Sequence, residues 1–322
     1  YGQPRLGGES GSTVASACAW MIAGLGKFGG VEMGFASDLE LMLVYAGEGR
    51  TDGNSVLTNA QFFERMVRMI EQGIRAPQDG IFHVDLRIRP YGQAGPAAVR
   101  FSDLATYYAV GGPAWPYERQ ALVRFRHVAG DRVFGDEVTC SVQRMVYAAE
   151  DFDFAAMNAM RERQVRQLVR GGTINAKLSD GGLVDCEYAV QALQLVFGGR
   201  FAGLRHQSTL AVLSAAQRAD LISLEQQSAV ERAYVFLREL IDCLRMARGN
   251  AKDLTVPASG SRDWQQLSSR MSSIHDSSIP LELLEQQMAV MQQTISDLNS
   301  RLIAAQKTVS PPGEFEGSLL AD

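Results

Sequence analysis

The sequence predicts an α+β protein in which a small β-sheet with helices is followed by an all-α helical bundle. Before about residue 140, short apolar runs alternate with turns that are rich in glycine and proline. After that point, apolar residues recur mainly at the spacing of helices. The length of 322 residues is that of about two domains. We therefore expect two structural units along one chain.

The chain is expected to begin with a linker and two strands. Residues 1–16 are rich in glycine and serine, which favours a linker. The apolar run 17–23 is closed by Gly24, which is typical of a buried strand. After a glycine-rich turn, residues 37–45 are predicted to form a second strand with its polar residues only at the start.

Four further elements complete the first unit. Residues 58–74 predict a helix, because they begin with a capping-box sequence and carry one apolar stripe. Residues 81–88 alternate between apolar and polar, which predicts a third strand that Pro90 ends. We expect a short helix near 102–109 and a strand near 121–128.

The rest of the chain is predicted to be helical, with helices at 150–170, 183–197, 207–217 and 224–247. Residues 248–278 are expected to form a loop with one short helix, and a last helix runs over 280–307. The expected division of the chain is a linker at 1–16, the sheet unit at 17–140, the bundle at 141–250, a loop and C-terminal helix at 251–307, and a disordered tail at 308–322.

Charge and hydropathy exclude two classes of partner. Lys and Arg total 31 and Asp and Glu total 36, which gives a net charge of −5. Broad binding of nucleic acid or anionic lipid needs a basic surface, so we expect neither partner. No stretch approaches the roughly 20 apolar residues of a membrane helix. Because the first residue is Tyr1 rather than Met, we interpret the chain as a piece of a longer polypeptide.

Cysteine and histidine are too scattered to suggest a zinc site or a disulfide framework. The sequence has 4 Cys and 4 His, and it contains no Cys-x-x-Cys pair. This cysteine usage favours the reducing cytoplasm as the location.

Three carboxylates carry the chemical prediction. Asp38 and Glu40 are two residues apart on a predicted strand, so both side chains point to one face. Asp85 lies on another strand of the same small sheet and is able to join them. Carboxylates that converge in this way repel each other unless a cation lies between them, and hard oxygen ligands suit Mg²⁺ together with substrate phosphates. The pattern predicts a site for attack on a nucleotide that is assisted by two metal ions.

The glycine turn before these acids offers backbone N–H groups to phosphates, ahead of a short helix expected to start near Gly29. Gly24, Gly26 and Gly29 also match the dinucleotide-binding pattern, with Glu48 as its ribose acid. That fold needs a crossover of about a dozen residues between its strands, and the interval here is too short. A P-loop is excluded because Phe28 follows Lys27 where that motif has Ser or Thr.

A series of motifs resembles the nucleotidyltransferase domain of glutamine synthetase adenylyltransferase/adenylyl-removing enzymes, of the DNA polymerase β-like superfamily. The resemblance covers about residues 17–250 and, more loosely, the last helix. The motifs are Gly24-x-Gly26-Lys27-x-Gly29-Gly30, Ser37-Asp38-x-Glu40, Val84-Asp85-x-Arg87-x-Arg89-Pro90, and the segments 59–63, 118–124, 128–131 and 177–188.

The resemblance implies a polymerase-β-like sheet, a helical bundle, and Mg²⁺-dependent transfer of AMP between ATP and a tyrosine of glutamine synthetase, in the control of nitrogen assimilation. Full-length members carry two such modules. One attaches AMP and the other removes it by phosphorolysis, and this chain holds one module. The implied partners are glutamine synthetase and PII signalling proteins.

The resemblance also implies residue roles. Asp38, Glu40 and Asp85 would hold Mg²⁺, and Asp85 would accept the tyrosine proton. The nucleotide would be bound by Gly29, Gly30, Ser37, Lys27, Arg87 and Arg89. For the two arginines, structural pairing with Asp85 or with the bundle is the alternative. Three residues of the 177–188 motif are expected at the domain junction in a structural role, namely Lys177, Asp185 and Glu187.

Departures from the family pattern leave activity and direction open. The pattern has Asp where this chain has Glu40, and Tyr117 replaces a usual Trp. A weakened enzyme, or a non-catalytic module that binds glutamine synthetase or its signalling partners, is therefore the alternative. Asp185 resembles the copy that attaches AMP, whereas the segment 59–63 resembles the removing copy. We favour attachment.

The last helix has two interpretations. Its apolar residues follow alternating spacing of three and four over about three heptads, which suits a coiled-coil seam and dimerisation. The seam contains Leu281, Leu284, Met288, Met291, Ile295, Leu298 and Leu302. We favour the alternative that the helix packs on the protein's own bundle, because methionines at seam positions specify a partner poorly.

Overall fold

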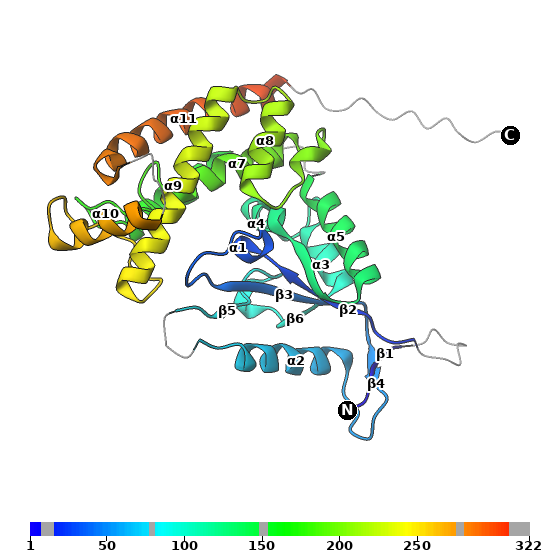
Figure 1. Ribbon diagram of the computed structural model, residues 1–322. Coiled ribbons are helices and arrows are strands. Elements are labelled where there is room, and N and C mark those ends of the chain that lie inside the picture. The colour runs from blue at the N-terminus through cyan, green and yellow to red at the C-terminus, as the bar shows by residue number, and fades with distance from the viewer. Residues whose placement is uncertain (8–15, 77–80, 148–153, 275–279, 309–322) are drawn as a thin grey trace.

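The computed structural model describes residues 1–7, 16–76, 81–147, 154–274 and 280–308. Figure 1 shows a sheet part, in blue to blue-green, beneath a helical part that runs from green to red. The predicted α+β class is confirmed. Among the described residues, no helix is long and apolar enough to cross a membrane. The tail from residue 309 onward lies outside the described residues.

The central sheet is built around β3 (Leu39–Tyr45). It runs antiparallel to β2 (Trp20–Gly24) and parallel to both β5 (Val84–Asp85) and β6 (Ala98–Arg100). β2 also pairs with β7 (Arg126–Gly130), which gives the order β5-β3-β2-β7 with β6 beside β3. β5 and β6 therefore pair with successive parts of β3, and β5 lies at the beginning of that strand.

The two faces of β3 belong to two different cores, because side chains alternate along a strand. Leu43 and Tyr45 pack with buried residues of α2 (Asn59–Gly73). Met42 and Val44 belong to a core that contains residues of α3 (Phe101–Tyr108) and α5 (Arg132–Tyr147). In Figure 1, α2 lies below the sheet and α3 and α5 lie above it. The sheet is therefore covered on both faces.

The predicted capping box at the start of α2 is present. The hydroxyl of Thr58 accepts a hydrogen bond from the backbone N–H of Gln61, and the Gln61 side chain accepts one from the Thr58 backbone. Two shorter helices complete this part, α1 (Gly26–Gly29) and α4 (Pro116–Ala121). Pro116 occupies the first turn of α4, where a missing N–H costs nothing.

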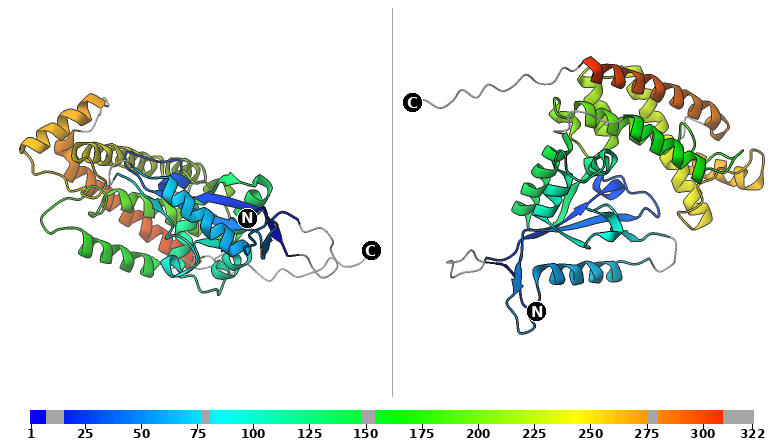
Figure 2. Two further views of the ribbon diagram at one scale, coloured as in Figure 1. Left: turned by 90° about the horizontal axis from the view of Figure 1, so that it is seen from below. Right: turned by 180° about the vertical axis from the view of Figure 1, so that it is seen from behind.

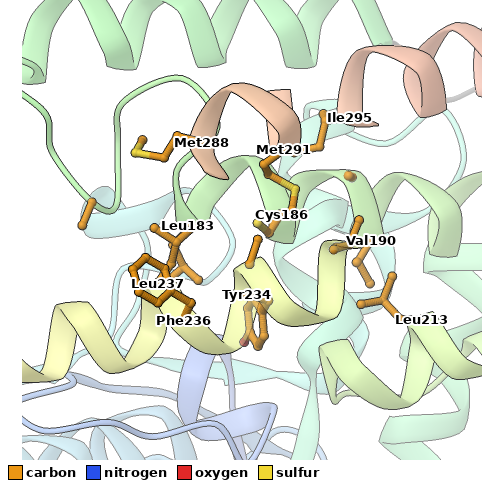
Figure 3. Close-up of a cluster of buried hydrophobic side chains, with 14 of the residues drawn as sticks. Leu183, Cys186, Val190, Leu213, Tyr234, Phe236, Leu237, Met288, Met291 and Ile295 are labelled. Carbon is orange, nitrogen blue, oxygen red and sulfur yellow. The ribbon is translucent and has the colours of Figure 1, made fainter. Parts of the chain in front are cut away.

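The helical part contains α6 (Phe154–Leu168), α7 (Leu183–Phe197), α8 (Thr209–Arg218), α9 (Leu224–Arg248), α10 (Arg262–Ile274) and α11 (Leu284–Thr308). One core holds these helices together. Figure 3 shows Cys186 of α7 between Met291 of α11 and Tyr234 of α9. The right-hand view of Figure 2 shows α11, in brown to red, on the side of the helical part away from the sheet, and α7 packs against both α9 and α11. The bounds of α7 agree with the sequence prediction, and Gly198 follows its last residue as a local stop signal.

The seam of the last helix is buried within the chain. All seven seam residues are at most 9% exposed, and α11 packs against α7 and α9. This arrangement supports the interpretation that the helix packs on its own bundle. Dimerisation through the same face would require α11 to leave that core.

Several predicted elements differ from the structure in the sheet part. The sequence predicts a linker over residues 4–6, but Pro4–Leu6 forms strand β1, which pairs with β4 (Gly49–Thr51). The rest of that linker, from 8 to 15, lies outside the described residues. The strand predicted at 81–88 is limited to Val84–Asp85, because only the start of β3 is available to pair with it.

The region around residue 130 also differs from the prediction. The run 121–128 alternates like a strand, but it forms the end of α4, a 3₁₀ turn at Leu122–Arg124 and the start of β7. Its buried side chains belong to the core that the sheet shares with α3 and α5. α5 is not predicted by the sequence pattern, since Gly135 interrupts it. A Cβ there would be 2.3 Å from the His127 ring, so the glycine permits close packing. α5 also crosses the expected boundary between 140 and 141.

Candidate functional site

Glu40 and Asp85 lie side by side at one end of the central sheet. In the parallel pairing of β3 with β5, Glu40 is in register with Asp85. Neighbouring strands are about 4.8 Å apart, so side chains in register lie close together on one face. Asp38 lies one residue before β3, and both aspartate charges act on Glu40. The structure therefore brings the predicted acids into one neighbourhood, from two strands.

The Glu40 side chain lies against the glycine turn. A Cβ on Gly26 would be 1.1 Å from Oε2 of Glu40, and Gly26 has a φ of +47°. The N–H of Leu25 donates to the backbone oxygen of Glu40 at 2.9 Å, which fixes the turn to β3. Burial first, and then the charges of Asp85 and Asp38, raise the pKa of the Glu40 carboxyl. A cation at this position would relieve that penalty on the charged form.

Asp85 is buried and held by Arg87. Nε of Arg87 is 2.9 Å from Oδ1, its Nη2 is 2.6 Å from Oδ2, and its backbone N–H donates to Oδ1 at 2.9 Å. Burial opposes ionisation, but the bonds to Arg87 outweigh it and lower the pKa of the Asp85 carboxyl. The Arg87 side chain is 64% exposed. Arg87 thus forms the pair with Asp85 that was one of its two sequence alternatives, and its role toward the nucleotide stays a prediction.

Asp38 is half-exposed and held by His83. Its Oδ1 is 2.8 Å from Nδ1 of His83 and accepts the backbone N–H of the same residue at 3.1 Å. His83 comes directly before β5, so this contact joins the starts of β3 and β5. The geometry fixes Asp38 beside the pair formed by Glu40 and Asp85.

The donor set suits Mg²⁺ in type, because it consists of carboxylate oxygens. Within the described ranges, no three His, Cys, Asp or Glu side chains are arranged closely enough to hold a metal ion. Arg87 contacts the carboxylate of Asp85, and His83 contacts the carboxylate of Asp38. A cation bound by the acids would therefore compete with these two groups for the carboxylate oxygens of Asp85 and Asp38.

The glycine turn is a helix start rather than an open loop. α1 begins at Gly26, earlier than the start predicted near Gly29. The N–H of Gly29 donates to Leu25 at 2.7 Å, and that of Gly30 donates to Gly26 at 3.1 Å. A Cβ on Gly29 would be 2.0 Å from the backbone oxygen of Arg124, so this glycine permits a close backbone approach. The role of Gly29 and Gly30 in phosphate binding stays a prediction.

Ser37 is buried in the loop before Asp38. Its hydroxyl accepts the N–H of Gly34 at 3.1 Å and a bond from Nη1 of Arg245 at 3.4 Å.

Arg89 lies beyond β5, where its guanidinium donates to backbone oxygens of Leu86 and Gly95. Its nucleotide role also stays a prediction.

Lys27 points toward the helical part. Its ammonium pairs with Glu187 of α7 and lies 5.6 Å from the centre of the Tyr234 ring. Burial lowers the pKa of Lys27, and the charge of Glu187 opposes this shift. Burial also disfavours the charged form of Glu187, but Lys27 and Arg124 outweigh it and lower the pKa to about 2. Glu187 therefore links α1 to α7, at the junction where it was expected.

The other two expected junction residues have different surroundings. Asp185 accepts Nε of Arg161 at 2.5 Å and the N–H of Gly181 at 2.7 Å, so it fixes the loop that precedes α7. Lys177 lies in the same loop, and its charge acts on both Glu40 and Glu187. The structural role expected for Asp185 fits these contacts.

A buried ionic cluster beside the site was not predicted. Arg124 is 7% exposed, and its Nη2 lies 3.2 Å from Glu32 and 3.4 Å from Glu187. Glu32, whose side chain is 9% exposed, also accepts the N–H of Thr209 at 2.6 Å and the hydroxyl of Tyr234 at 2.7 Å. The available signal was a glutamate, Glu32, two residues after the glycine turn. An analysis of apolar periodicity does not use such a signal.

A hollow of about 690 Å³ opens beside Asp38. It is lined by the end of α2, by the segment that leads into β5, and by residues 251–252 after α9. Its wall includes the apolar Ile74 and Phe82 and the polar His83 and Lys252. Asp38 is therefore accessible from this hollow, which lies between the sheet part and residues that follow α9.

Comparisons with known families match both parts of the chain. Residues 5–140 match glutamate-ammonia ligase adenylyltransferase, and residues 155–303 match GlnD PII-uridylyltransferase. A relative from Shewanella woodyi, named bifunctional glutamine synthetase adenylyltransferase/adenylyl-removing enzyme, is 34% identical over 256 residues, which is 77% of this chain and 26% of the relative.

Two further relatives carry the same name. The one from Aromatoleum aromaticum is 35% identical over 226 residues, or 68% of this chain and 24% of the relative. The one from Hahella chejuensis is 34% identical over 242 residues, or 72% of this chain and 25% of the relative. This chain belongs to the glutamine synthetase adenylyltransferase/adenylyl-removing enzyme family. It spans about a quarter of the length of the curated relatives it matches.

In this member of the family, the sequence departure at Glu40 has a structural counterpart. The pattern that the sequence resembles has Asp at this position, and Glu is longer by one methylene. The carboxylate of Glu40 extends into the space beside Cα of Gly26, where a Cβ would displace it. The glycine therefore accommodates the longer side chain.

Proposed function

We propose that this chain is one nucleotidyltransferase module, which moves AMP between ATP and a tyrosine of glutamine synthetase with Mg²⁺ held by Asp38, Glu40 and Asp85. The observation that carries the proposal is the register of Glu40 with Asp85 beside Gly26. The names of the three relatives, each a glutamine synthetase adenylyltransferase/adenylyl-removing enzyme, support the substrate.

In the attaching direction, the tyrosine oxygen bonds to the α-phosphorus of ATP, and the bond from that phosphorus to pyrophosphate breaks. Asp85 accepts the tyrosine proton after Arg87 turns from it to the phosphates, a movement that the exposure of Arg87 allows. The hollow beside Asp38 provides space for the acceptor. Bound Mg²⁺ would supply neutralisation of the phosphate and carboxylate charge.

Attachment is the proposed direction, on the resemblance of Asp185 and its motif to the attaching copy. Removal would run by phosphorolysis, in which a phosphate oxygen bonds to the phosphorus of the AMP group, the bond from that phosphorus to the tyrosine oxygen breaks, and ADP and the reprotonated tyrosine are the products. An assay in each direction with the same preparation distinguishes them. Faster release of ADP from adenylylated glutamine synthetase than attachment from ATP would overturn the proposed direction.

A non-catalytic module that binds glutamine synthetase is the second candidate. The observation that favours it is the engagement of Asp85 by Arg87 and of Asp38 by His83, which leaves two of the three acids paired with protein groups. This candidate predicts binding of glutamine synthetase without transfer of AMP in either direction.

One assay separates the candidates. The chain is incubated with Mg²⁺, ATP labelled in its AMP part, and purified glutamine synthetase. Label on glutamine synthetase that disappears on chelation of the metal supports the enzyme. Absence of label in both directions, together with capture of glutamine synthetase by the immobilised chain, supports the binding module.

A further inference from the structure

We propose that Glu32 and Arg245 are positioning residues, through which one face of α9 fixes the loop 30–38 and so sets the place of Ser37 and Asp38 for the nucleotide. This inference rests on the proposed function and deepens it. The loop 30–38, called the site loop below, connects α1 to the first of the three acids. Figure 1 shows it between the sheet and α9.

Glu32 fixes the first half of the site loop. Its Oε1 accepts the backbone N–H of Thr209 at 2.6 Å, at the start of α8. Its Oε2 accepts the hydroxyls of Thr209 and Tyr234 at 3.1 Å and 2.7 Å and lies 3.2 Å from Nη2 of Arg124. Buried carboxylates are stable only with such partners. Glu32 thus ties the loop to α8, to α9 and to the sheet part together.

Arg238 extends this attachment to the backbone of the loop. Its Nη2 donates to the backbone oxygen of Glu32 at 2.6 Å, and its Nη1 donates to the hydroxyl of Tyr234 at 3.1 Å. Both the main chain and the side chain of Glu32 are therefore held by α9. Tyr234 is buried in the core of the helical part, and Figure 3 shows its hydroxyl end at the edge of the apolar cluster.

The second half of the site loop lies against later turns of α9. A Cβ on Gly34 would be 2.5 Å from Oδ1 of Asp242, so the absence of a side chain at Gly34 allows the loop backbone to lie close to α9. Nη1 of Arg245 donates to the backbone oxygen of Phe35 at 2.9 Å and lies 3.4 Å from the Ser37 hydroxyl. Helix positions spaced by three and four share one face, so Arg245, Asp242 and Arg238 form one surface.

The backbone of the site loop needs this support. Val31 has a φ of +57° and Ala36 a φ of +55°, which are left-handed conformations that residues with a Cβ rarely adopt. Such conformations persist where surrounding contacts impose them, and they are frequent at functional sites. α9 donates hydrogen bonds to the backbone oxygens of Glu32 and Phe35, which lie between these two positions. We therefore infer that α9 imposes the backbone path that ends at Asp38.

The consequence is that the helical part belongs to the nucleotide site. α9 is held in a core with α7 and α11, so it offers the loop a fixed reference. Misplacement of a reacting group by about 1 Å can cost about 100-fold in rate. A shift of α9 relative to the sheet would therefore change nucleotide affinity and rate without touching the acids.

The test compares Arg245→Met and Glu32→Gln with Arg232→Gln, which changes an exposed arginine on the same helix. Arg245→Lys is the conservative variant. Each protein is assayed for AMP transfer at varied ATP and at varied glutamine synthetase. Hydrogen exchange of the peptide that covers residues 30–38 is measured in parallel, and circular dichroism and thermal melting report the fold.

The proposal expects Arg245→Met and Glu32→Gln to lower kcat/KM for ATP by about 10- to 100-fold, with KM for glutamine synthetase unchanged. It expects faster exchange in residues 30–38, partial rescue by Arg245→Lys, and no effect of Arg232→Gln. If Glu32→Gln does not fold, Arg245→Met decides. A folded Arg245→Met protein with unchanged exchange and unchanged ATP kinetics would overturn the proposal.

The exchange measurement keeps this proposal separate from the proposed function. If the wild-type chain transfers no AMP, the proposed function fails, and exchange of residues 30–38 still decides the positioning role. Faster exchange in Arg245→Met, confined to this loop, supports the attachment to α9. Equal exchange in Arg245→Met and Arg232→Gln overturns it.

Discussion

Gly26 lies so close to Glu40 that a Cβ on the glycine would be 1.1 Å from a carboxylate oxygen. The contact joins the glycine turn to the middle acid of the site. It also explains how a glutamate occupies a position where the family pattern has the shorter aspartate. The position of the Glu40 carboxylate therefore depends on the absence of a side chain at Gly26.

Gly26→Ala should therefore lower AMP transfer by at least about 100-fold, because the new methyl group displaces the Glu40 carboxylate. Gly111→Ala is the matched control. Gly111 has a φ of +74°, and a Cβ there would have no neighbour within 4 Å, so it shares the backbone strain without the contact. Both variants should lose about 1–2 kcal/mol of unfolding free energy, measured in urea. Equal transfer by the two variants would contradict the role given to Gly26.

Asp38→Ala should abolish Mg²⁺-dependent AMP transfer and leave the fold intact. Its carboxylate is half-exposed and pairs with the exposed His83, so its loss removes little packing. Asp52→Ala is the control, because Asp52 also forms a half-exposed ion pair, with Arg5 at 2.7 Å. Labelled AMP on glutamine synthetase is the readout, and thermal melting reports the fold. Full transfer by Asp38→Ala would refute the assignment.

Glu187→Gln should lower the unfolding free energy by about 3 kcal/mol at pH 7, since Lys27 and Arg124 lose their buried partner. The pKa of Glu187 falls from 4.5 to about 2 on folding. A depressed carboxyl pKa stabilises the fold above the unfolded value and loses this contribution as pH falls toward the folded value. The difference between wild type and variant should therefore narrow from pH 6 to pH 3.

Urea unfolding at several pH values measures this effect. Glu162→Gln, which changes an exposed glutamate of α6, should alter the unfolding free energy by less than about 0.5 kcal/mol throughout. A gap between wild type and Glu187→Gln that stays constant from pH 6 to pH 3 would show that the ionised form of Glu187 is not what stabilises the junction.

Leu298→Ala in α11 should cost about 2–5 kcal/mol of unfolding free energy, because Leu298 is 2% exposed in the core with α7 and α9. Val290→Ala changes a residue that is 49% exposed on the same helix and should cost less than about 0.5 kcal/mol. Light scattering at equal concentrations should give one molar mass for both variants and for the wild type. A fall in mass with Leu298→Ala would instead favour dimerisation through this seam.

The sequence by itself determined the elements whose signals are local. The apolar run 41–45 predicted the strand that contains Glu40, and helical periodicity with its stop signal gave the bounds of α7. The seam of α11 was also predictable, because burial of a helix face requires apolar residues at fixed intervals.

Only the tertiary structure decided which charges meet. Lys27 pairs with Glu187, which is 160 residues away, and its predicted role in phosphate binding stays a prediction. Glu32 carried no periodic signal, yet it joins α8, α9 and the sheet part at the junction. Periodicity encodes which face of an element is buried. It does not encode which distant polar group shares that buried space, because this depends on how the finished elements pack.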